Sequence, residues 1–553
     1  MAPQNIVRLG LAVAGGVCLD LAFPNWGVAG LGWIGPGLLL AAGLGCRPGR
    51  AFGFGFIGGF VFNLTSLSWF LSIPDPAGSV AAWIGLGLYC SLYSALWVWL
   101  AVRALPPVVV AIRYPDLALI GRLSWSQRVS WSLFCAASWV GLEMVRGRFL
   151  TGFPWNFLGT SQFKMLPVIQ VAAWTGVYGV SFLMVWFSAS LLCAVATLAV
   201  NASKVRPWAG DMILPLLTVS VVTAAGFDRM AGGARREGEN SADRGLKIAL
   251  VQPSIPQTLI WSTAGEAARF EKLVAMSATA LAGHPDVLVW PEGVMPPWTL
   301  QNFNAVTNIA ATHKVWLILQ ADDGDQTAAG SKSYNAAFLF APDGRFITTY
   351  RKRRLVIFGE YIPLVQWFPF IKHFTPIEGG YSAGERPGEF LLNGPTARLG
   401  IFICFEDVFP DSTREFVKPG TDILVNLTND GWFGEGSEQW QHAAMGIFRA
   451  VENGVTVVRA TNNGVTCWVD PWGRVREFLA PEGSIYKAGI FEVEVPLLKP
   501  GARTPTFYNL HGDLFGWICL AASAAAVVLG GQRRRSDGTA SLLPPLPAVD
   551  ESA

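Results

Sequence analysis

Charged residues are scarce in this chain. Only 14% of its 553 residues are Asp, Glu, Lys or Arg, whereas soluble domains average about 25%. More than half of the residues, 52%, are hydrophobic. This composition excludes a single soluble domain and a disordered chain, and it indicates segments surrounded by lipid. The 41 basic and 39 acidic residues leave a formal charge of +2, which gives no electrostatic footprint for nucleic acid.

Metal ligands are scarce as well. The chain has five histidines and eight cysteines, with no CxxC pair and no His/Cys cluster at the spacing of a zinc site. We therefore expect neither a metal nor a cofactor. His442 lies in a predicted helix, and for such a histidine a structural role is more common than a catalytic one.

Long hydrophobic runs are abundant. Eight approach the roughly 20 residues that cross a bilayer, and they lie near 7–23, 27–45, 52–74, 80–104, 129–145, 171–200, 211–228 and 513–530. Lys and Arg concentrate in alternate connections, which places both termini in the cytoplasm and the long polar stretch outside it. We predict seven membrane helices over 1–228, a linker over 229–245, an outer domain over 246–512, an eighth membrane helix over 513–530 and a disordered cytoplasmic tail over 531–553.

The outer stretch alternates strand-like and helical patterns. Residues 266–282 and 439–453 carry apolar side chains at helical spacing. Near-continuous apolar runs predict strands that begin near residues 246, 286, 315, 334, 397, 422, 456 and 466. Such runs are typical of buried sheets, so we predict an α/β layered domain with its active groups at strand ends.

Three polar residues stand near the ends of predicted strands. Glu292 closes LVWPE, Cys404 closes RLGIFIC, and Lys352 lies in YRKRRLVIFGEYIP. Taken singly, each has an ordinary explanation as a solvated carboxylate, a core cysteine or a charged surface lysine. Taken together, they are the groups that acyl transfer needs. A thiolate attacks the carbonyl, an ammonium lowers the thiol pKa and stabilises the oxyanion, and a carboxylate moves protons.

An ordered set of motifs resembles the apolipoprotein N-acyltransferases, the membrane members of the nitrilase (carbon-nitrogen hydrolase) superfamily. In the outer domain the motifs are VQPSIPQTLIW (251–261), WPE (290–292), KRRLVIFGEYIP (352–363), CFE (404–406), NLTNDGWFG (426–434), QH with a following RAVENG (441–454) and RATNNG (459–464). In the membrane part they are RGRFLTGFPWN (146–156) and YGVSF (178–182). The likeness covers nearly the whole chain. It departs at Ile357, where the family usually has Pro, and at Phe405, where Tyr is common.

The resemblance implies a polytopic helical membrane bundle with a nitrilase-like αββα sandwich, and a catalytic triad of Glu292, Lys352 and Cys404. It implies further residues around the triad: Glu360, Phe405 and Glu406 as supports, and Trp261 and Trp432 at the substrate entrance. The implied reaction has two steps. Cys404 takes the sn-1 acyl chain of a membrane phospholipid as a thioester, and the α-amine of a diacylglyceryl lipoprotein then accepts it. The implied setting is the bacterial inner membrane, where we expect a monomer.

Two other functions fit parts of the same sequence. A membrane-anchored amidase would use the same three residues with water as the acceptor, although it does not need eight membrane spans. A transporter or assembly scaffold would use the outer domain only for binding, which leaves the joint presence of Glu292, Lys352 and Cys404 without a purpose.

Overall fold

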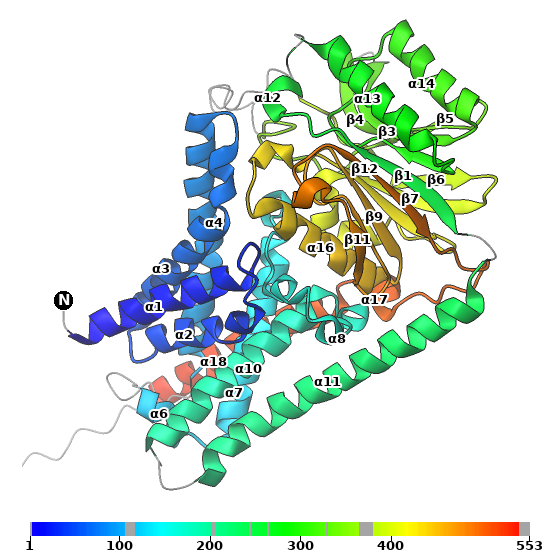
Figure 1. Ribbon diagram of the computed structural model, residues 1–553. Helices are drawn as coiled ribbons and strands as arrows, with labels where there is room; N and C mark the ends of the chain where they lie inside the picture. Colours follow the sequence, from blue (N-terminus) through cyan, green and yellow to red (C-terminus); the bar gives the residue numbers. More distant parts are fainter. Residues whose placement is uncertain are drawn as a thin grey trace, which may run out of the picture.

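The chain forms two parts that lie against each other, a bundle of helices and an α/β domain (Figure 1). The computed structural model describes residues 3–105, 117–200, 205–242, 245–260, 262, 265–327, 330–363 and 380–540. The bundle includes helices from both ends of the chain, because α18 (Leu514–Ala540) returns to pack on α7 (Trp125–Arg146). The α/β domain is therefore tied to the bundle at both of its ends.

The eight predicted membrane runs are mostly helical. Besides α7 and α18, the longer helices are α1 (Pro3–Ala22), α3 (Pro48–Ser66), α4 (Pro76–Arg103), α10 (Val177–Val200) and α11 (Val205–Asn240). Short helices connect them, namely α6 (Leu117–Arg122), α8 (Leu166–Ile169), α9 (Ala172–Thr175) and α17 (Phe507–His511). Among the described helices, four are long and apolar enough to cross a membrane: α1, α4, α10 and the part of α11 from Trp208 onward.

The predicted run 27–45 is not one continuous helix. It is divided between a 3₁₀ turn, η1 (Ala29–Trp33), and α2 (Gly35–Gly43). A helix of nine residues is only about 14 Å long, whereas the hydrocarbon core of a bilayer is about 30 Å thick. Helix α2 alone is therefore too short to cross a bilayer.

Small residues allow close contact between α1, α3 and α4. Gly16 of α1 lies against α3, where an added Cβ would come within 2.3 Å of the carbonyl oxygen of Gly58. On another side of α3, Gly59 packs on Ser94 of α4. Helices in lipid associate by such close packing, because lipid tails provide no hydrophobic driving force between them.

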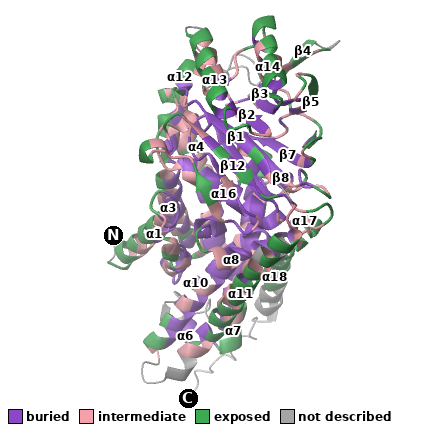
Figure 2. Cartoon of the chain, turned by 45° about the vertical axis from the view of Figure 1, so that its right-hand side comes forward, coloured by how far each residue is buried: buried purple, intermediate pink, exposed green. Residues whose placement is uncertain are grey.

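The outer faces of the bundle are apolar. Figure 2 shows exposed stretches along α11, in contrast to the buried interior of the domain. The exposed large hydrophobic side chains of α11 and α18 are Ile213, Leu216, Leu217, Val221, Phe227, Leu514, Trp517, Ile518, Val527, Val528 and Leu529. An extended apolar surface of this kind is typical of a protein face that contacts lipid.

Two segments beyond the predicted membrane runs are helical. The Gly-rich residues 229–240, predicted as part of a linker, continue α11 to Asn240. Residues 531–540, predicted as part of a disordered tail, continue α18, and the rest of that tail lies outside the described residues. Each segment extends an existing helix. Extension adds a hydrogen bond per residue without a new nucleation cost, which offsets the roughly 1 kcal/mol penalty of a glycine.

The α/β domain contains two six-stranded sheets. The strand order is β12-β1-β2-β3-β4-β5 in the first and β11-β10-β9-β8-β7-β6 in the second. Neighbours are parallel along β1-β2-β3 and β7-β8-β9 and antiparallel elsewhere. The strands are β1 (Leu246–Gln252), β2 (Val287–Val289), β3 (Trp316–Thr327), β4 (Gly330–Phe340), β5 (Phe346–Arg351), β6 (Gly388–Leu392), β7 (Ala397–Ile403), β8 (Ile423–Thr428), β9 (Thr456–Thr461), β10 (Cys467–Val469), β11 (Val475–Phe478) and β12 (Gly489–Val495).

The sheets form the two middle layers of a four-layer sandwich. Ile248 and Leu250 of β1 lie in the core between the sheets, together with Ile403 of β7. Ala249 points the other way, toward Leu273 of α13 (Glu266–Leu281), which covers the first sheet with α14 (Leu300–His313). Helix α16 (Glu438–Asn453) covers the second sheet. The predicted layered α/β domain is confirmed in its two-sheet architecture.

Helix α16 is also the surface on which the domain meets the bundle. Nearly all of its residues are buried, because it lies between β9 and the bundle helix α9. Near its end, the Glu452 carboxylate accepts a 2.9 Å hydrogen bond from the backbone N–H of Val177, the first residue of α10. The free N–H groups and the dipole at a helix N-terminus stabilise such a carboxylate. The contact joins the end of α16 to the start of a bundle helix.

Candidate active site

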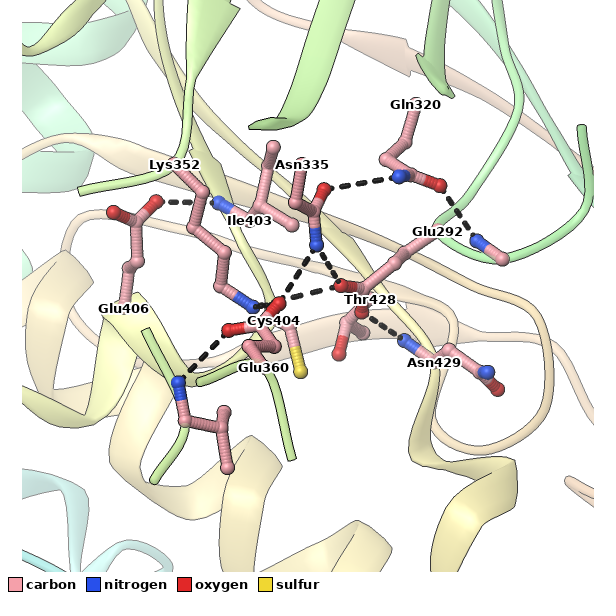
Figure 3. Close-up of polar contacts among 12 residues, drawn as sticks. Glu292, Gln320, Asn335, Lys352, Glu360, Ile403, Cys404, Glu406, Thr428 and Asn429 are labelled. Carbon is pink, nitrogen blue, oxygen red and sulfur yellow. Dashed lines mark hydrogen bonds and ion pairs between the residues drawn. The ribbon is translucent and has the colours of Figure 1, made fainter. Parts of the chain in front are cut away.

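The three residues singled out by chemistry converge at one end of the two sheets (Figure 3). Glu292 follows β2, Lys352 follows β5 directly, and Cys404 follows β7 directly. Lys352 Nζ lies 3.5 Å from Glu292 Oε1, and the sulfur of Cys404 lies beside these two side chains (Figure 3). The structure thus brings together a thiol, a carboxylate and an ammonium from three separate strands.

The backbone of Cys404 is in an unusual conformation. Its φ is +51°, in the left-handed region that side-chain-bearing residues rarely adopt. Cys404 is the first residue of the 3₁₀ turn η6 (Cys404–Val408), so the chain reverses abruptly at the end of β7. Such strain persists only where the surroundings hold it, and it is concentrated at functional sites. The turn places the thiol beyond the edge of the sheet.

The charge of Lys352 is compensated by two carboxylates. Its side chain is 1% exposed, and Nζ donates a 2.8 Å hydrogen bond to Glu360 Oε1 in addition to its contact with Glu292. Glu360 also accepts from the backbone N–H of Val356 at 2.8 Å. The structure therefore places Glu360, a predicted support, directly on the ammonium.

Two residues that the sequence analysis missed orient the carboxylates. Asn335 of β4 donates from Nδ2 to Glu292 at 2.8 Å and to Glu360 at 2.9 Å. Its Oδ1 accepts from Gln320 of β3 at 2.9 Å, and Gln320 Oε1 accepts from the Gly293 backbone N–H at 2.7 Å. Both lie in predicted strands, where an amide side chain carries no signal of its own. Their position on adjacent strands became evident only from the pairing of β3 with β4.

Glu406 joins the two sheets beneath the site. Its carboxylate accepts 2.8 Å hydrogen bonds from the backbone N–H groups of Arg353 and Ile403. It also accepts from Arg354 N–H at 3.1 Å and from the hydroxyl of Tyr350 at 2.7 Å. These donors come from the segment around Lys352 and from the strand that ends at Cys404. Glu406 therefore fixes the lysine relative to the cysteine.

Burial dominates the proton affinities of the site. It raises the pKa of Glu292, although the ammonium of Lys352 opposes this rise. Burial opposes the charge on Lys352, but Glu360 and Glu292 outweigh it and hold the pKa of that lysine well above its ordinary value.

The expected low thiol pKa was wrong. Burial and the Glu292 carboxylate raise the pKa of Cys404 well above its ordinary value, and the Lys352 ammonium only partly opposes them. The two carboxylates largely neutralise the field of that ammonium. The resting thiol therefore keeps its proton at neutral pH, and a neighbouring carboxylate is in place to receive it.

Aromatic rings from both parts of the protein gather beside Cys404. We call them the aromatic cluster, and its rings are Trp69, Phe70, Phe153, Trp155, Phe405, Phe409 and Phe433. The ring of Phe405, next to the cysteine, stacks on Trp155 with centroids 6.4 Å apart. Trp155 contacts Trp69 at 5.1 Å, and Trp69 contacts Phe433 at 4.6 Å. Phe405 thus begins a continuous row of rings that passes into the bundle.

Of the two tryptophans predicted at the entrance, one lies among the described residues. Trp432 lies in the turn η7 (Asp430–Phe433), next to the cluster residue Phe433, and is partly exposed. Trp261 lies outside the described residues.

His442 is held by carboxylates on both ring nitrogens. Nε2 lies 2.7 Å from Asp407 Oδ1 and Nδ1 lies 2.9 Å from Asp430 Oδ1. Burial opposes the charged ring, but Asp407 and Asp430 outweigh it and raise the pKa of His442 to about 10. Although Asp430, Glu438 and His442 lie close enough to share a metal ion, the Arg459 guanidinium already pairs with Asp407 and Asp430. The positive charges of protein groups thus occupy the place of a cation.

Two family models match consecutive parts of the chain. The model described as the apolipoprotein N-acyltransferase N-terminal domain matches residues 15–190. The model described as carbon-nitrogen hydrolase matches residues 247–486. The first covers most of the bundle, and the second covers most of the α/β domain, with all three converging residues.

Full-length relatives share both parts. The apolipoprotein N-acyltransferase of Geobacter metallireducens is 33% identical over 532 residues, which cover 95% of each chain. That of Gloeobacter violaceus is 31% identical over 540 residues, or 95% of this chain and 94% of the relative. That of Chlorobaculum tepidum is 27% identical over 82% of this chain and 88% of the relative.

The role of Glu406 can be tested by stability. We expect Glu406→Gln to lower the free energy of unfolding by about 1–3 kcal/mol, because an amide NH₂ would face N–H donors and leave some of them unsatisfied. Thermal unfolding of the detergent-solubilised protein measures this loss. Glu415→Gln is the matched control, since Glu415 is a half-exposed partner of Arg353 and its loss should change stability by about 0.5 kcal/mol or less. Equal melting temperatures of the two variants would contradict the role of Glu406 in joining the two sheets.

Proposed function

The chain belongs to the apolipoprotein N-acyltransferase family of the carbon-nitrogen hydrolase superfamily, and we propose that Cys404, Glu292 and Lys352 carry out its acyl transfer. The protein is an acyltransferase that N-acylates lipoproteins. The observation that carries the proposed roles is the convergence of a buried carboxylate, a buried ammonium and a thiol at the ends of three strands.

In the first step, Cys404 accepts an acyl chain from a phospholipid. Glu292 takes the thiol proton while Sγ attacks the carbonyl carbon of the sn-1 ester, which forms the S–C bond. The ammonium of Lys352 stabilises the negative charge that develops on the carbonyl oxygen. The ester C–O bond then breaks, and Glu292 returns the proton to the departing oxygen of the lysophospholipid.

In the second step, the α-amine of the diacylglyceryl cysteine of a lipoprotein attacks the thioester. Glu292 accepts a proton from the attacking nitrogen, an amide bond forms, and the Cys404 thiolate leaves. The thiolate is reprotonated through Glu292, which restores the resting pair. Each substrate uses the same three groups in turn, as a ping-pong reaction requires.

We assign supporting roles to the residues around the triad. Glu360 holds Lys352 in place and shares its charge, and Glu406 fixes the lysine segment to the cysteine turn. Phe405 starts the aromatic cluster on which the acyl chain lies, and the cluster continues along Trp83 and Leu86 of α4. Trp432 lines the entrance, which its place beside Phe433 supports; the same role for Trp261, outside the described residues, rests on its sequence motif alone.

The membrane arrangement follows the distribution of basic residues. We propose seven membrane helices within 1–228, a catalytic domain over 246–512 and an eighth helix over 513–530, with both termini in the cytoplasm of a bacterium and the domain outside its inner membrane. Basic residues lie at helix ends that this arrangement assigns to the cytoplasm, which supports the orientation: Arg8 of α1 bonds to the Leu44 carbonyl oxygen, Arg47 precedes α3, and Arg103 and Arg122 end α4 and α6. We propose that the enzyme acts as a monomer on two lipid-anchored substrates.

Hydrolysis of an amide by water is the second candidate for the same residues. It is not favoured, because the relatives that span the whole chain are N-acyltransferases and the bundle is part of the match. A purely binding role for the domain leaves the compensated lysine and the strained cysteine without a purpose.

The acyl-enzyme can be detected directly. A phospholipid with a labelled sn-1 chain should transfer its label to the purified protein, and neutral hydroxylamine should remove it, because a thioester is more labile than an amide. Intact mass measures the adduct. Cys404→Ala should carry no label, whereas Cys467→Ala, which changes a buried cysteine outside the site, should retain it. Addition of a diacylglyceryl peptide should move the label to the peptide amine, and transfer to water alone would favour the amidase.

The pH dependence reports on the base. Acylation needs Glu292 ionised, so the rate is present above the pKa of Glu292 and is lost as the pH falls through it. Because burial raises that pKa, the acidic limb should lie above the ordinary glutamate value of about 4.3. Single-turnover acylation from pH 4 to 9 measures the limb. We expect Glu292→Gln to slow acylation by roughly 10²–10⁴-fold and to remove the limb. The same limb in that variant would show that another group is the base.

A further inference from the structure

Gln441 makes an unusual set of contacts for a residue of the catalytic domain. It lies on α16 and is 1% exposed, and its Oε1 accepts hydrogen bonds from Trp155 Nε1 at 2.9 Å and from Trp69 Nε1 and Asn156 Nδ2 at 3.1 Å each. Its Nε2 donates to the carbonyl oxygens of Pro24 at 3.0 Å and Ser66 at 3.1 Å. All five partners belong to the bundle.

The orientation of this amide is determined by its partners. An indole N–H can only donate and a backbone carbonyl can only accept, so the oxygen must face the tryptophans and the nitrogen must face Pro24 and Ser66. Both N–H groups and the oxygen are fully used. A buried amide satisfied in this way has one position, and it holds its five partners in one arrangement.

The segment of α16 that carries Gln441 is itself held in place. The next residue, His442, bridges Asp407 and Asp430 through its two ring nitrogens. Asp407 belongs to the turn that begins with Cys404, and Asp430 belongs to the turn that carries Trp432. Consecutive side chains of α16 therefore join the cysteine turn on one side and the bundle on the other.

The two indoles held by Gln441 are the centre of the aromatic cluster. Trp155 stacks on Phe405 and Trp69 packs on Phe433, so displacement of either indole shifts the surface next to Cys404. Without the amide, two indole N–H groups and two carbonyls would remain buried without these partners, and the rings would have to move to satisfy them.

We propose that Gln441 is a positioning residue that sets where the donor acyl chain lies relative to Cys404, by holding Trp69 and Trp155 in register with Phe405. The inference rests on the proposed acyl transfer. A long chain contacts much of the cluster and a short chain contacts only the part near the cysteine. Loss of Gln441 therefore impairs long-chain donors selectively, while the reactivity of the thiol itself stays the same.

The test compares two donors with one headgroup, one with a palmitoyl and one with an octanoyl chain at the sn-1 position. Single-turnover acylation of the full-length protein in one detergent is followed by intact mass. For Gln441→Met, which keeps the length of the side chain but removes the amide, we expect the palmitoyl-to-octanoyl rate ratio to fall roughly tenfold. The variant and the wild-type protein should be alkylated by iodoacetamide at Cys404 at the same rate. The reaction is run on the full-length protein and quantified on the Cys404 peptide after digestion.

Gln170→Met is the matched control. Gln170 is also fully buried and also joins the bundle to the domain, where its Nε2 donates to the Trp472 carbonyl oxygen at 2.8 Å, but it lies outside the aromatic cluster. Its loss should leave the ratio of the two donors unchanged. If Gln441→Met slows both donors equally, or behaves as Gln170→Met does, Gln441 only stabilises the fold and the proposal is overturned.

A second pair of variants covers a folding failure of Gln441→Met. Trp155→Phe and Trp69→Phe each remove one indole N–H and keep an aromatic ring, and both should lower the same ratio. An unchanged ratio in both overturns the proposal. A wild-type protein that forms no adduct with either donor instead overturns acyl transfer through Cys404, so the two failures are distinguishable.

Discussion

A buried ammonium group is the constraint to which the rest of the site conforms. An unpaired ammonium removed from water costs several kcal/mol, so Lys352 can occupy its position only if anionic groups reach it there. Glu360 arrives from the segment that follows the lysine, and Glu292 from a different strand. Asn335 binds both carboxylates and so prevents either from turning away. The Cys404 thiol lies beside Lys352. Because the two carboxylates offset the charge of the ammonium, the thiol remains protonated at rest.

A protonated thiol next to a carboxylate suits an enzyme that must hold a reactive intermediate in a lipid setting. A permanent thiolate would react with any electrophile that reached it. In this site the nucleophile forms only as the proton moves to Glu292, when an acyl carbonyl is in position. In our proposal, the aromatic cluster and Gln441 determine which acyl carbonyls reach that position. Glu406 holds the segment of Lys352 against the strand that ends at Cys404, although the two come from different sheets.

Much of the fold could be predicted from the sequence, and the misses have a common cause. The eight predicted strands are all present and are all interior strands, with neighbours on both sides and continuous apolar runs. The four that escaped prediction, β5, β6, β11 and β12, are the edges of the two sheets. An edge strand is partly solvated, so its sequence mixes polar and apolar residues, as the burial pattern of β12 shows. The pattern that identifies a strand is thus weakest where the sheet ends.

The candidate site divides in the same way. Glu292, Lys352 and Cys404 could be singled out because their chemistry is distinctive, and Glu360 and Glu406 because the motifs around them resemble a family. Asn335 and Gln320 could not, because an amide has no function until its neighbours are known. Gln441 belongs to one of those motifs, but its role could not be predicted because its partners Trp69 and Trp155 are hundreds of residues away. The prediction of a low thiol pKa was wrong for a related reason. The sequence names one cation near the cysteine, but only the structure places two carboxylates on it.

The unbroken course of α11 has a consequence for the geometry of the whole enzyme. The helix runs from the bundle to the foot of the domain, where Ser241 pairs with Leu498 just before β1 begins. Beyond Pro215, which lies inside the helix near its start, each residue of α11 adds about 100° of rotation and 1.5 Å of length. The number of residues in α11 therefore sets both the height and the azimuth at which β1 begins. An insertion or deletion of a single residue would rotate the domain away from the bundle residues that Gln441 contacts. A change of a whole number of turns would preserve the orientation of the domain and alter only its height.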